Sequence, residues 1–171
     1  MIKLSLLISI IFQIFLFASC TSYRLGNNKP VKFESIESIS VPIVKTNITK
    51  PRLQTLVTNS IIKSIQEKGA YKIKKENDSD ATLYGKIISI DRKQLRANRE
   101  NVLRTTEMEF TIELEYEIIN NSNGVTIAKG TTKGKSSSYL NANFQLTENH
   151  SLRNAADQLA ISLANTLSEG Y

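Results

Sequence analysis

Hydrophobic and polar residues alternate most regularly between residues 107 and 118. The apolar positions are Met108, Phe110, Ile112, Leu114, Tyr116 and Ile118, and the polar ones include Glu107, Glu109, Glu113, Glu115 and Glu117. This period of two predicts a half-buried strand whose outer face carries a row of carboxylates. Because like charges along one strand face repel, we expect cations opposite them on the neighbouring strands, from Lys86, Arg92, Lys129 and Lys133.

The flanking segments predict partner strands for it. Residues 120–124 read Asn-Asn-Ser-Asn-Gly, and Asn-Gly is the favoured dipeptide of a tight hairpin turn, so residues 125–139 are expected to return as a strand. Residues 81–90 predict another strand, in which Gly85 indicates a bulge or close backbone packing. The charged residues 91–101 either extend that strand past the core or form a mobile hairpin tip.

Two shorter segments also have the character of strands. Residues 36–43 alternate at Ile39, Val41 and Ile43, and Pro42 indicates an edge strand or a strand end, because proline cannot donate a hydrogen bond to a neighbouring strand. Tyr71 and Ile73 predict a further short strand.

Two segments follow the period of a helix. The first, over about residues 50–68, has Thr49 as its expected N-cap and Gly69 as its stop. The second is expected to begin at a Thr147 cap and to end at Gly170. The apolar stripes of the two helices comprise Leu53, Leu56, Val57, Ile61 and Ile65, and then Leu152, Ala155, Ala156, Leu159, Leu163 and Leu167.

The order of these elements predicts the fold class. Two amphipathic helices each bury one stripe, and the long strands bury one face. We therefore expect an α+β two-layer sandwich, with both helices packed on one face of a mostly antiparallel sheet of four to five strands. The other face of that sheet would be polar and solvated.

The N-terminus has the pattern of an export signal. Lys3 precedes an apolar run of about 14 residues that ends in Ala18-Ser19-Cys20, and this run is shorter than the roughly 20 residues of a membrane-spanning helix. Residues 1–19 are therefore interpreted as a signal peptide. Residues 20–35 would form a lipidated tether, and residues 36–171 a single domain. Phe17-Ala18-Ser19-Cys20 resembles the bacterial lipobox, which implies that Cys20 carries the lipid.

Cysteine usage and charge limit the possible partners. Cys20 is the only cysteine, so an intramolecular disulfide is excluded. Cleavage would remove only Lys3 from the 22 basic residues and leave 21 against 16 acidic ones, a net charge of +5. Export argues against nucleic acid as a partner. Anionic lipid or glycolipid headgroups, or simply solvated lysines, account for the basic balance.

Motifs in four places resemble the lipopolysaccharide-assembly lipoproteins, the LptE-like or rare lipoprotein B family. They are the mature start at residues 20–26, the segment from Ile39 to Leu53, the strand Ser79-Asp80-Ala81-Thr82-Leu83-Tyr84-Gly85-Lys86-Ile87, and the closing helix at Arg153-Asn154-Ala155-Ala156. The resemblance implies an outer-membrane lipoprotein that sits as a plug inside a large LptD-like β-barrel. It also implies help in barrel assembly, binding of lipopolysaccharide, and no catalysis. Thr21 after the cysteine is similar to the sorting signal for the outer membrane.

Lipopolysaccharide carries phosphates and acidic sugars, so the candidate ligand-binding residues are cations. One cluster comprises Arg92, Lys93, Arg96, Arg99 and Arg104, and the second comprises Lys129, Lys133 and Lys135. The first would face lipopolysaccharide or the barrel lumen. The alternative is a solvated hairpin that forms salt bridges with the carboxylate row.

No cofactor or metal site is expected. The carboxylates alternate along one open strand face and would not surround an ion, and His150 has no second histidine or cysteine nearby. No nucleophile with a base partner is evident, which disfavours a membrane-tethered hydrolase. The remaining alternative is a membrane-anchored periplasmic binding or scaffold module of another envelope complex.

Overall fold

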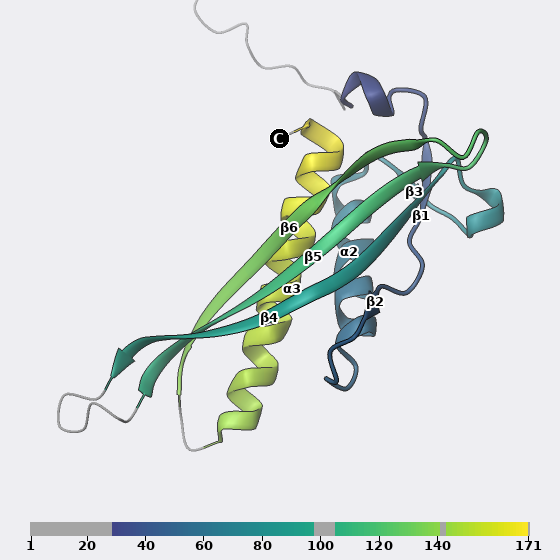
Figure 1. Cartoon of the computed structure of the whole chain (residues 1–171). Helices are drawn as coiled ribbons and strands as arrows, with labels where there is room; N and C mark the ends of the chain where they lie inside the picture. Colours follow the sequence, from purple (N-terminus) through teal and green to yellow (C-terminus); the bar gives the residue numbers. More distant parts are fainter. Residues whose placement is uncertain (1–28, 98–104, 141–142, 171) are drawn as a thin grey trace, which may run out of the picture.

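The computed structural model describes residues 29–97, 105–140 and 143–170. Its sheet is built on three long strands, β4 (Ala81–Ala97), β5 (Thr105–Asn120) and β6 (Thr126–Tyr139), which follow one another as an antiparallel meander (Figure 1). Three short strands, β1 (Ser38–Ser40), β2 (Lys45–Thr46) and β3 (Lys72–Ile73), complete the sheet in parallel pairings. The strand order is β3-β1-β4-β5-β6, and β2 pairs with β4 outside this path.

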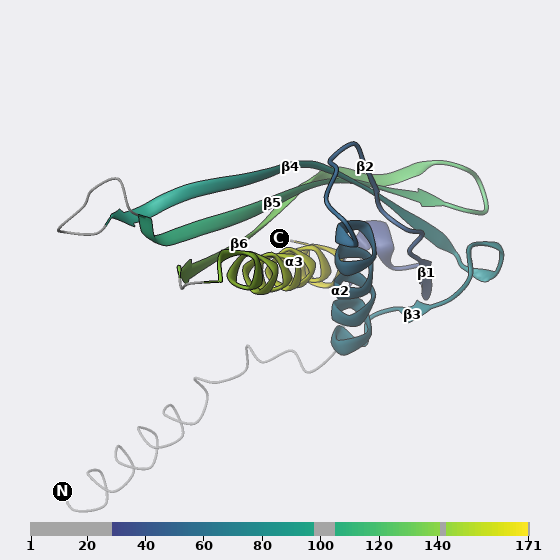
Figure 2. The same ribbon diagram turned by 90° about the horizontal axis from the view of Figure 1, so that it is seen from below.

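Both long helices cover one face of the sheet, as predicted for a two-layer α+β sandwich (Figure 2). They are α2 (Leu53–Lys68) and α3 (Phe144–Glu169), and two short 3-10 turns, η1 (Val31–Phe33) and η2 (Glu76–Asp78), complete the structure. The expected stripes are confirmed: Val57, Ile61 and Leu159 are fully buried. From the sheet, Phe110, Ile112, Leu114 and Ile118 enter the same core, and burial of these apolar side chains is the main force that joins the two layers.

The predicted strand over residues 36–43 is wrong in its extent. β1 ends at Ser40 and β2 begins at Lys45, so the chain leaves the sheet around Pro42, which confirms the strand-end reading of that proline. Ile43, expected to be buried, is 66% exposed, and Val44 is buried in its place. Val44 packs on Gly85, where an added Cβ would lie 2.9 Å from Val44 Cγ1, so the glycine in β4 serves close packing as expected.

The predicted N-caps of both helices are wrong. α2 begins only at Leu53, after Arg52 with φ of 61°, and no side chain caps it, so Thr49 is not its cap. α3 begins at Phe144, where the Asn143 side chain accepts a hydrogen bond from the backbone N–H of Leu146, so the helix starts earlier than the expected Thr147 cap. Both stops are confirmed: the residues that follow the helices, Gly69 and Gly170, have φ of 68° and 81°.

The charged stretch after residue 90 continues β4 as far as Ala97. This is the first of the two expected alternatives, a strand that extends past the core. Residues 91–97 of β4 are all exposed, and they pair with the first part of β5. The end of this part of the β4–β5 hairpin projects beyond the start of α3 (Figure 2). We call residues 91–97 and 105–110 the arm.

Candidate functional site

The arm distributes its cations over both faces of the sheet, because successive side chains of a strand point to opposite sides. Arg92 pairs in register with the buried Phe110 and therefore faces the helices. Lys93 pairs with Glu109 and faces the outer side. Arg96 is opposite Glu107, with 3.1 Å between Arg96 Nε and Glu107 Oε2. Arg99 and Arg104 lie outside the described residues.

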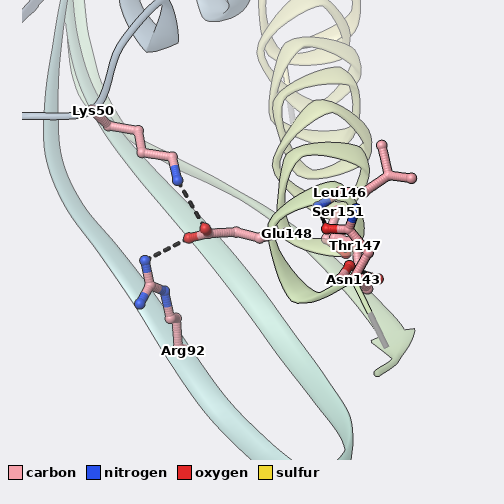
Figure 3. A network of polar contacts seen from close by, with 7 residues as sticks. All are labelled: Lys50, Arg92, Asn143, Leu146, Thr147, Glu148 and Ser151. Carbon is pink, nitrogen blue, oxygen red and sulfur yellow. Dashed lines mark hydrogen bonds and ion pairs between the residues drawn. The ribbon is translucent and has the colours of Figure 1, made fainter. Parts of the chain in front are cut away.

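Arg92 belongs to a polar cluster between the two layers (Figure 3). Its Nη2 is 2.5 Å from Glu148 Oε1, and the Nζ of Lys50 is 2.8 Å from Glu148 Oε2. The Glu148 side chain is only 6% exposed, whereas that of Arg92 is 50% exposed. One buried carboxylate of α3 therefore holds two cations, one from the segment that precedes α2 and one from the arm. The expectation that Arg92 faces the carboxylate row of β5 is wrong.

Beside this cluster lies an open pocket of ≈ 340 Å³. Arg92 and Lys50 line it together with Asp91, Ile48 and Ile90. Two cations and two carboxylates thus meet at the surface, where a ligand anion could reach Arg92 only in competition with Glu148.

Lys50 and Glu148 are members of this cluster that were not predicted from the sequence. A signal for Glu148 is present in the sequence, since it lies four residues before Leu152 and therefore on the apolar stripe of α3. A carboxylate on a buried stripe needs a paired cation. Only the fold shows which cations these are, because Lys50 and Arg92 are far from Glu148 along the chain.

The outer face of the sheet carries the predicted carboxylate row, with lysines of β6 on one side and Lys86 of β4 on the other. Lys133 of β6 lies 3.1 Å from Glu113, and Lys135 lies 3.6 Å from Glu109 on a diagonal. In register, Lys129 is opposite Glu117, and on the other side Lys86 of β4 is opposite Glu115. Three of the four expected partners are therefore confirmed as neighbours of the row. Each exposed pair contributes no more than about 1 kcal/mol.

The two predicted cation clusters meet at Glu109, which is opposite Lys93 and lies 3.6 Å from Lys135, but their other members are spread along the strand. Lys129 is opposite Glu117 and Arg96 is opposite Glu107, which are ten positions apart on β5. At about 3.3 Å per residue this corresponds to roughly 33 Å along the strand. Lys129 instead borders an open hollow of ≈ 560 Å³ on the outer face, which Lys45, Lys86 and Tyr84 also line.

Two further properties bear on function. Within the described part of the chain, no group of three or more His, Cys, Asp or Glu residues could hold a metal ion. Among the same residues, no helix has both the length and the apolar character needed to cross a membrane. His150 is exposed.

Solved structures share the fold at low sequence identity. The protein XCC0632 from Xanthomonas campestris superposes with a TM-score of 0.58 at 12% identity, over 80% of this chain and 90% of that one. The PelC dodecamer subunit from Paraburkholderia phytofirmans gives 0.54 at 11% identity, over 84% and 95%. A Caulobacter crescentus protein described as a lipoprotein gives 0.50 at 13% identity, over 73% and 87%.

Among curated proteins, none matches this sequence. The profile of one protein family does match, over residues 36–167, which covers all the long strands and most of both helices. That family is described as lipopolysaccharide-assembly, LptE, and its members are assembly lipoproteins without enzymatic activity. The sequence motifs in residues 79–87 and 153–156 lie within the matched range. The chain belongs to the LptE lipopolysaccharide-assembly family.

Proposed function

We propose that this protein is an outer-membrane lipoprotein that plugs a β-barrel lipopolysaccharide translocon, helps that barrel to assemble, and binds lipopolysaccharide during delivery to the cell surface. The observation that carries this proposal is membership of the LptE family over residues 36–167. In the proposal, cleavage after residue 19 exposes Cys20 for lipid attachment. Two or three acyl chains would hold the domain at the membrane essentially permanently.

The elongated shape of the domain supports a defined orientation relative to the membrane anchor. η1, the first described element, and the C-terminal end of α3 lie at one end of the molecule, and the arm lies at the other (Figure 1). Seventeen residues of β4 span about 56 Å at 3.3 Å per residue. A tether joined before η1 would therefore place the anchor at one end and direct the arm cations away from it.

The outer sheet face has the character that a barrel lumen requires. It presents alternating glutamates and lysines, and the interior of a transmembrane barrel is polar. Ion pairs such as Lys133–Glu113 could exchange partners with charged groups of the barrel wall at little cost. The partner we propose is a large LptD-like barrel.

Co-purification tests the barrel partner. The lipoprotein is extracted from outer membranes under mild detergent and the proteins bound to it are identified. The expected result is one large β-barrel protein in a fixed ratio. Recovery of soluble periplasmic proteins without a barrel would favour a scaffold module of another envelope complex and contradict the proposal.

Lipopolysaccharide binding is assigned to the cations of the arm together with Arg99 and Arg104, with phosphate groups as the contact. A variant with Lys93, Arg96, Arg99 and Arg104 all changed to Gln spares Arg92, whose removal would leave Glu148 short of a partner. We expect weaker binding of purified lipopolysaccharide, and a smaller loss of affinity as salt is raised. The matched control changes four exposed lysines elsewhere, Lys32, Lys63, Lys72 and Lys75, to Gln. Equal affinity of both variants, with folding intact, would contradict the assignment.

A further inference from the structure

β6 forms the outer border of the sheet and has one open side. Among the described strands it pairs only with β5, and it stands last in the strand order. It is 14 residues long, and α3 packs on its inward face, where Gly134 lies against the helix backbone. A strand edge of this length presents a row of backbone donors and acceptors that can pair with another chain.

The other open edge of the sheet is protected in a way that β6 is not. Beyond Ile87, β4 has no partner on the side away from β5 among the described strands, but its register shifts at three places between Ile87 and Ala97. Such bulges twist an edge and hinder pairing. β6 pairs with β5 without a shift from Ala128 to Tyr139, and it contains no proline.

The inward-facing positions of β6 are also without charge. These positions alternate along the strand and comprise Ala128, Gly130, Thr132, Gly134, Ser136 and Ser138. An inward-pointing charge is a common device against edge pairing. The row of lysines on the outer face of β6 is therefore the feature that determines which strands can pair with its edge.

That row determines what could pair. Lys129, Lys133 and Lys135 share the outer face, and the side chains of the last two are 54% and 60% exposed. A second copy of β6 would bring lysines against lysines, and like charges opposite each other on neighbouring strands are destabilising. An acidic strand would instead repeat what β5 does on the other side, where Glu113 lies 3.1 Å from Lys133.

We propose that the free edge of β6 binds an extended segment of a partner protein that carries carboxylates at alternate positions. The segment adds to the sheet as a further antiparallel strand. Backbone hydrogen bonds supply the pairing, and the three lysines select acidic over basic sequences. This inference does not depend on lipopolysaccharide binding by the arm, although the last residues of β6, Ser136 to Tyr139, pair with the arm residues Glu107 to Phe110.

The first experiment uses the full chain, purified in detergent, and synthetic peptides of about nine residues, a usual strand length. One peptide alternates Glu with Val, and the control alternates Lys with Val. We expect the acidic peptide to bind at least about tenfold more tightly than the basic one at low salt. Binding should slow hydrogen exchange of β6 amides, while β4 amides remain unchanged. Tight binding without slower exchange in β6 would overturn the proposal.

Two changes separate strand pairing from simple charge attraction. The triple variant Lys129→Gln, Lys133→Gln, Lys135→Gln should lose most of the affinity, whereas the matched variant Lys63→Gln, Lys72→Gln, Lys75→Gln should retain it. Two acidic peptides, one N-methylated at the Glu residues and the other at the Val residues, keep every carboxylate, and each lacks the backbone donors of one edge. The peptide that lacks the donors facing β6 should no longer bind or protect β6, whereas the other should still do so. Equal binding of both methylated peptides would show that the lysines only attract anions, and the proposal would fail.

Discussion

Gly134 of β6 lies directly beneath α3: a Cβ built on it would be 1.9 Å from the carbonyl oxygen of Ala155. The same Cβ would be 2.4 Å from the backbone nitrogen of Leu159. Both contacts are with helix backbone, which cannot rotate away as a side chain can. The glycine therefore sets how closely the second layer packs on this side of the sheet.

We expect Gly134→Ala to be among the most destabilising single-methyl additions in the protein. Either α3 moves off β6 or the strand bends, and overpacking of this kind costs about 1–3 kcal/mol or more. Urea unfolding of the purified variant measures the free energy of unfolding. Thr131→Ala, at an exposed position of the same strand, is the control and should change it by less than about 0.5 kcal/mol. Equal stability of the two variants would contradict the close approach.

Removing the two neighbouring cations Arg92 and Lys93 should have unequal effects on stability, because only Arg92 contacts Glu148. Arg92→Ala removes a partner of a carboxylate that is 6% exposed, and we expect a loss of about 1–2 kcal/mol. Lys93→Ala, on the opposite face of the same strand, should cost less than about 0.5 kcal/mol. A double-mutant cycle with Glu148→Gln, followed by urea unfolding, should give a favourable coupling energy for Arg92. A coupling near zero would show that the pair contributes nothing to stability.

Tyr71 predicts sensitivity to alkali. Burial raises the pKa of Tyr71 to about 12, and its hydroxyl donates a hydrogen bond to the Leu167 carbonyl oxygen at 2.7 Å. In the unfolded chain the phenol would lose its proton near pH 10. Its contribution to stability is therefore present below about pH 10 and declines as the pH rises toward 12. Tyr71→Phe should cost about 1 kcal/mol at pH 7, and the gap to the unmodified protein should narrow above pH 10.

Asp80 predicts the opposite dependence, at acid pH. Its Oδ2 accepts hydrogen bonds from the Ser38 hydroxyl at 2.9 Å and from the backbone N–H groups of Ser38 and Glu37. These bonds, the one from the Ser38 side chain first, hold the pKa of Asp80 below its usual range. The stabilisation is present above about pH 4, where the unfolded carboxyl is ionised, and is lost as the pH falls through the folded pKa. Asp80→Asn should lower the urea concentration at the denaturation midpoint at pH 7. Between pH 5 and pH 3 this midpoint should fall less steeply in the variant than in the unmodified protein. An unchanged profile would contradict this role.

The parts of the fold that the sequence predicted are those controlled by periodicity. Alternation over residues 107–118 defined β5 and its two faces, because each alternate side chain had to be buried or solvated. The helix stripes and the glycine stops followed from equally local rules. The register could not be predicted, and this is why Arg92 was expected on the wrong face: bulges between Ile87 and Ser89 exchange the sides on which later residues lie.

The ends of elements depended on tertiary contacts. Thr49 and Thr147 have the chemistry of N-caps, but Arg52 turns the chain immediately before α2, and Asn143 caps α3 one turn earlier than Thr147 would. With that earlier start, Glu148 lies inside α3, where it is buried. The candidate site was thus visible in the sequence as a set of cations, while the carboxylate that organises two of them became apparent only when the layers were assembled.

The base of the arm packs against α3 through Arg92 and Phe110, but its end extends beyond the helices, so the length of that end is independent of the packed core. Adding two residues to each strand would lengthen it by about 7 Å and leave every side chain on its present face. Adding one residue to each would exchange the faces and direct the outer charges toward the helices. Evolution can therefore adjust the reach of this protein in paired steps, and related chains are expected to differ there by an even number of residues in each strand while their sandwich stays the same size.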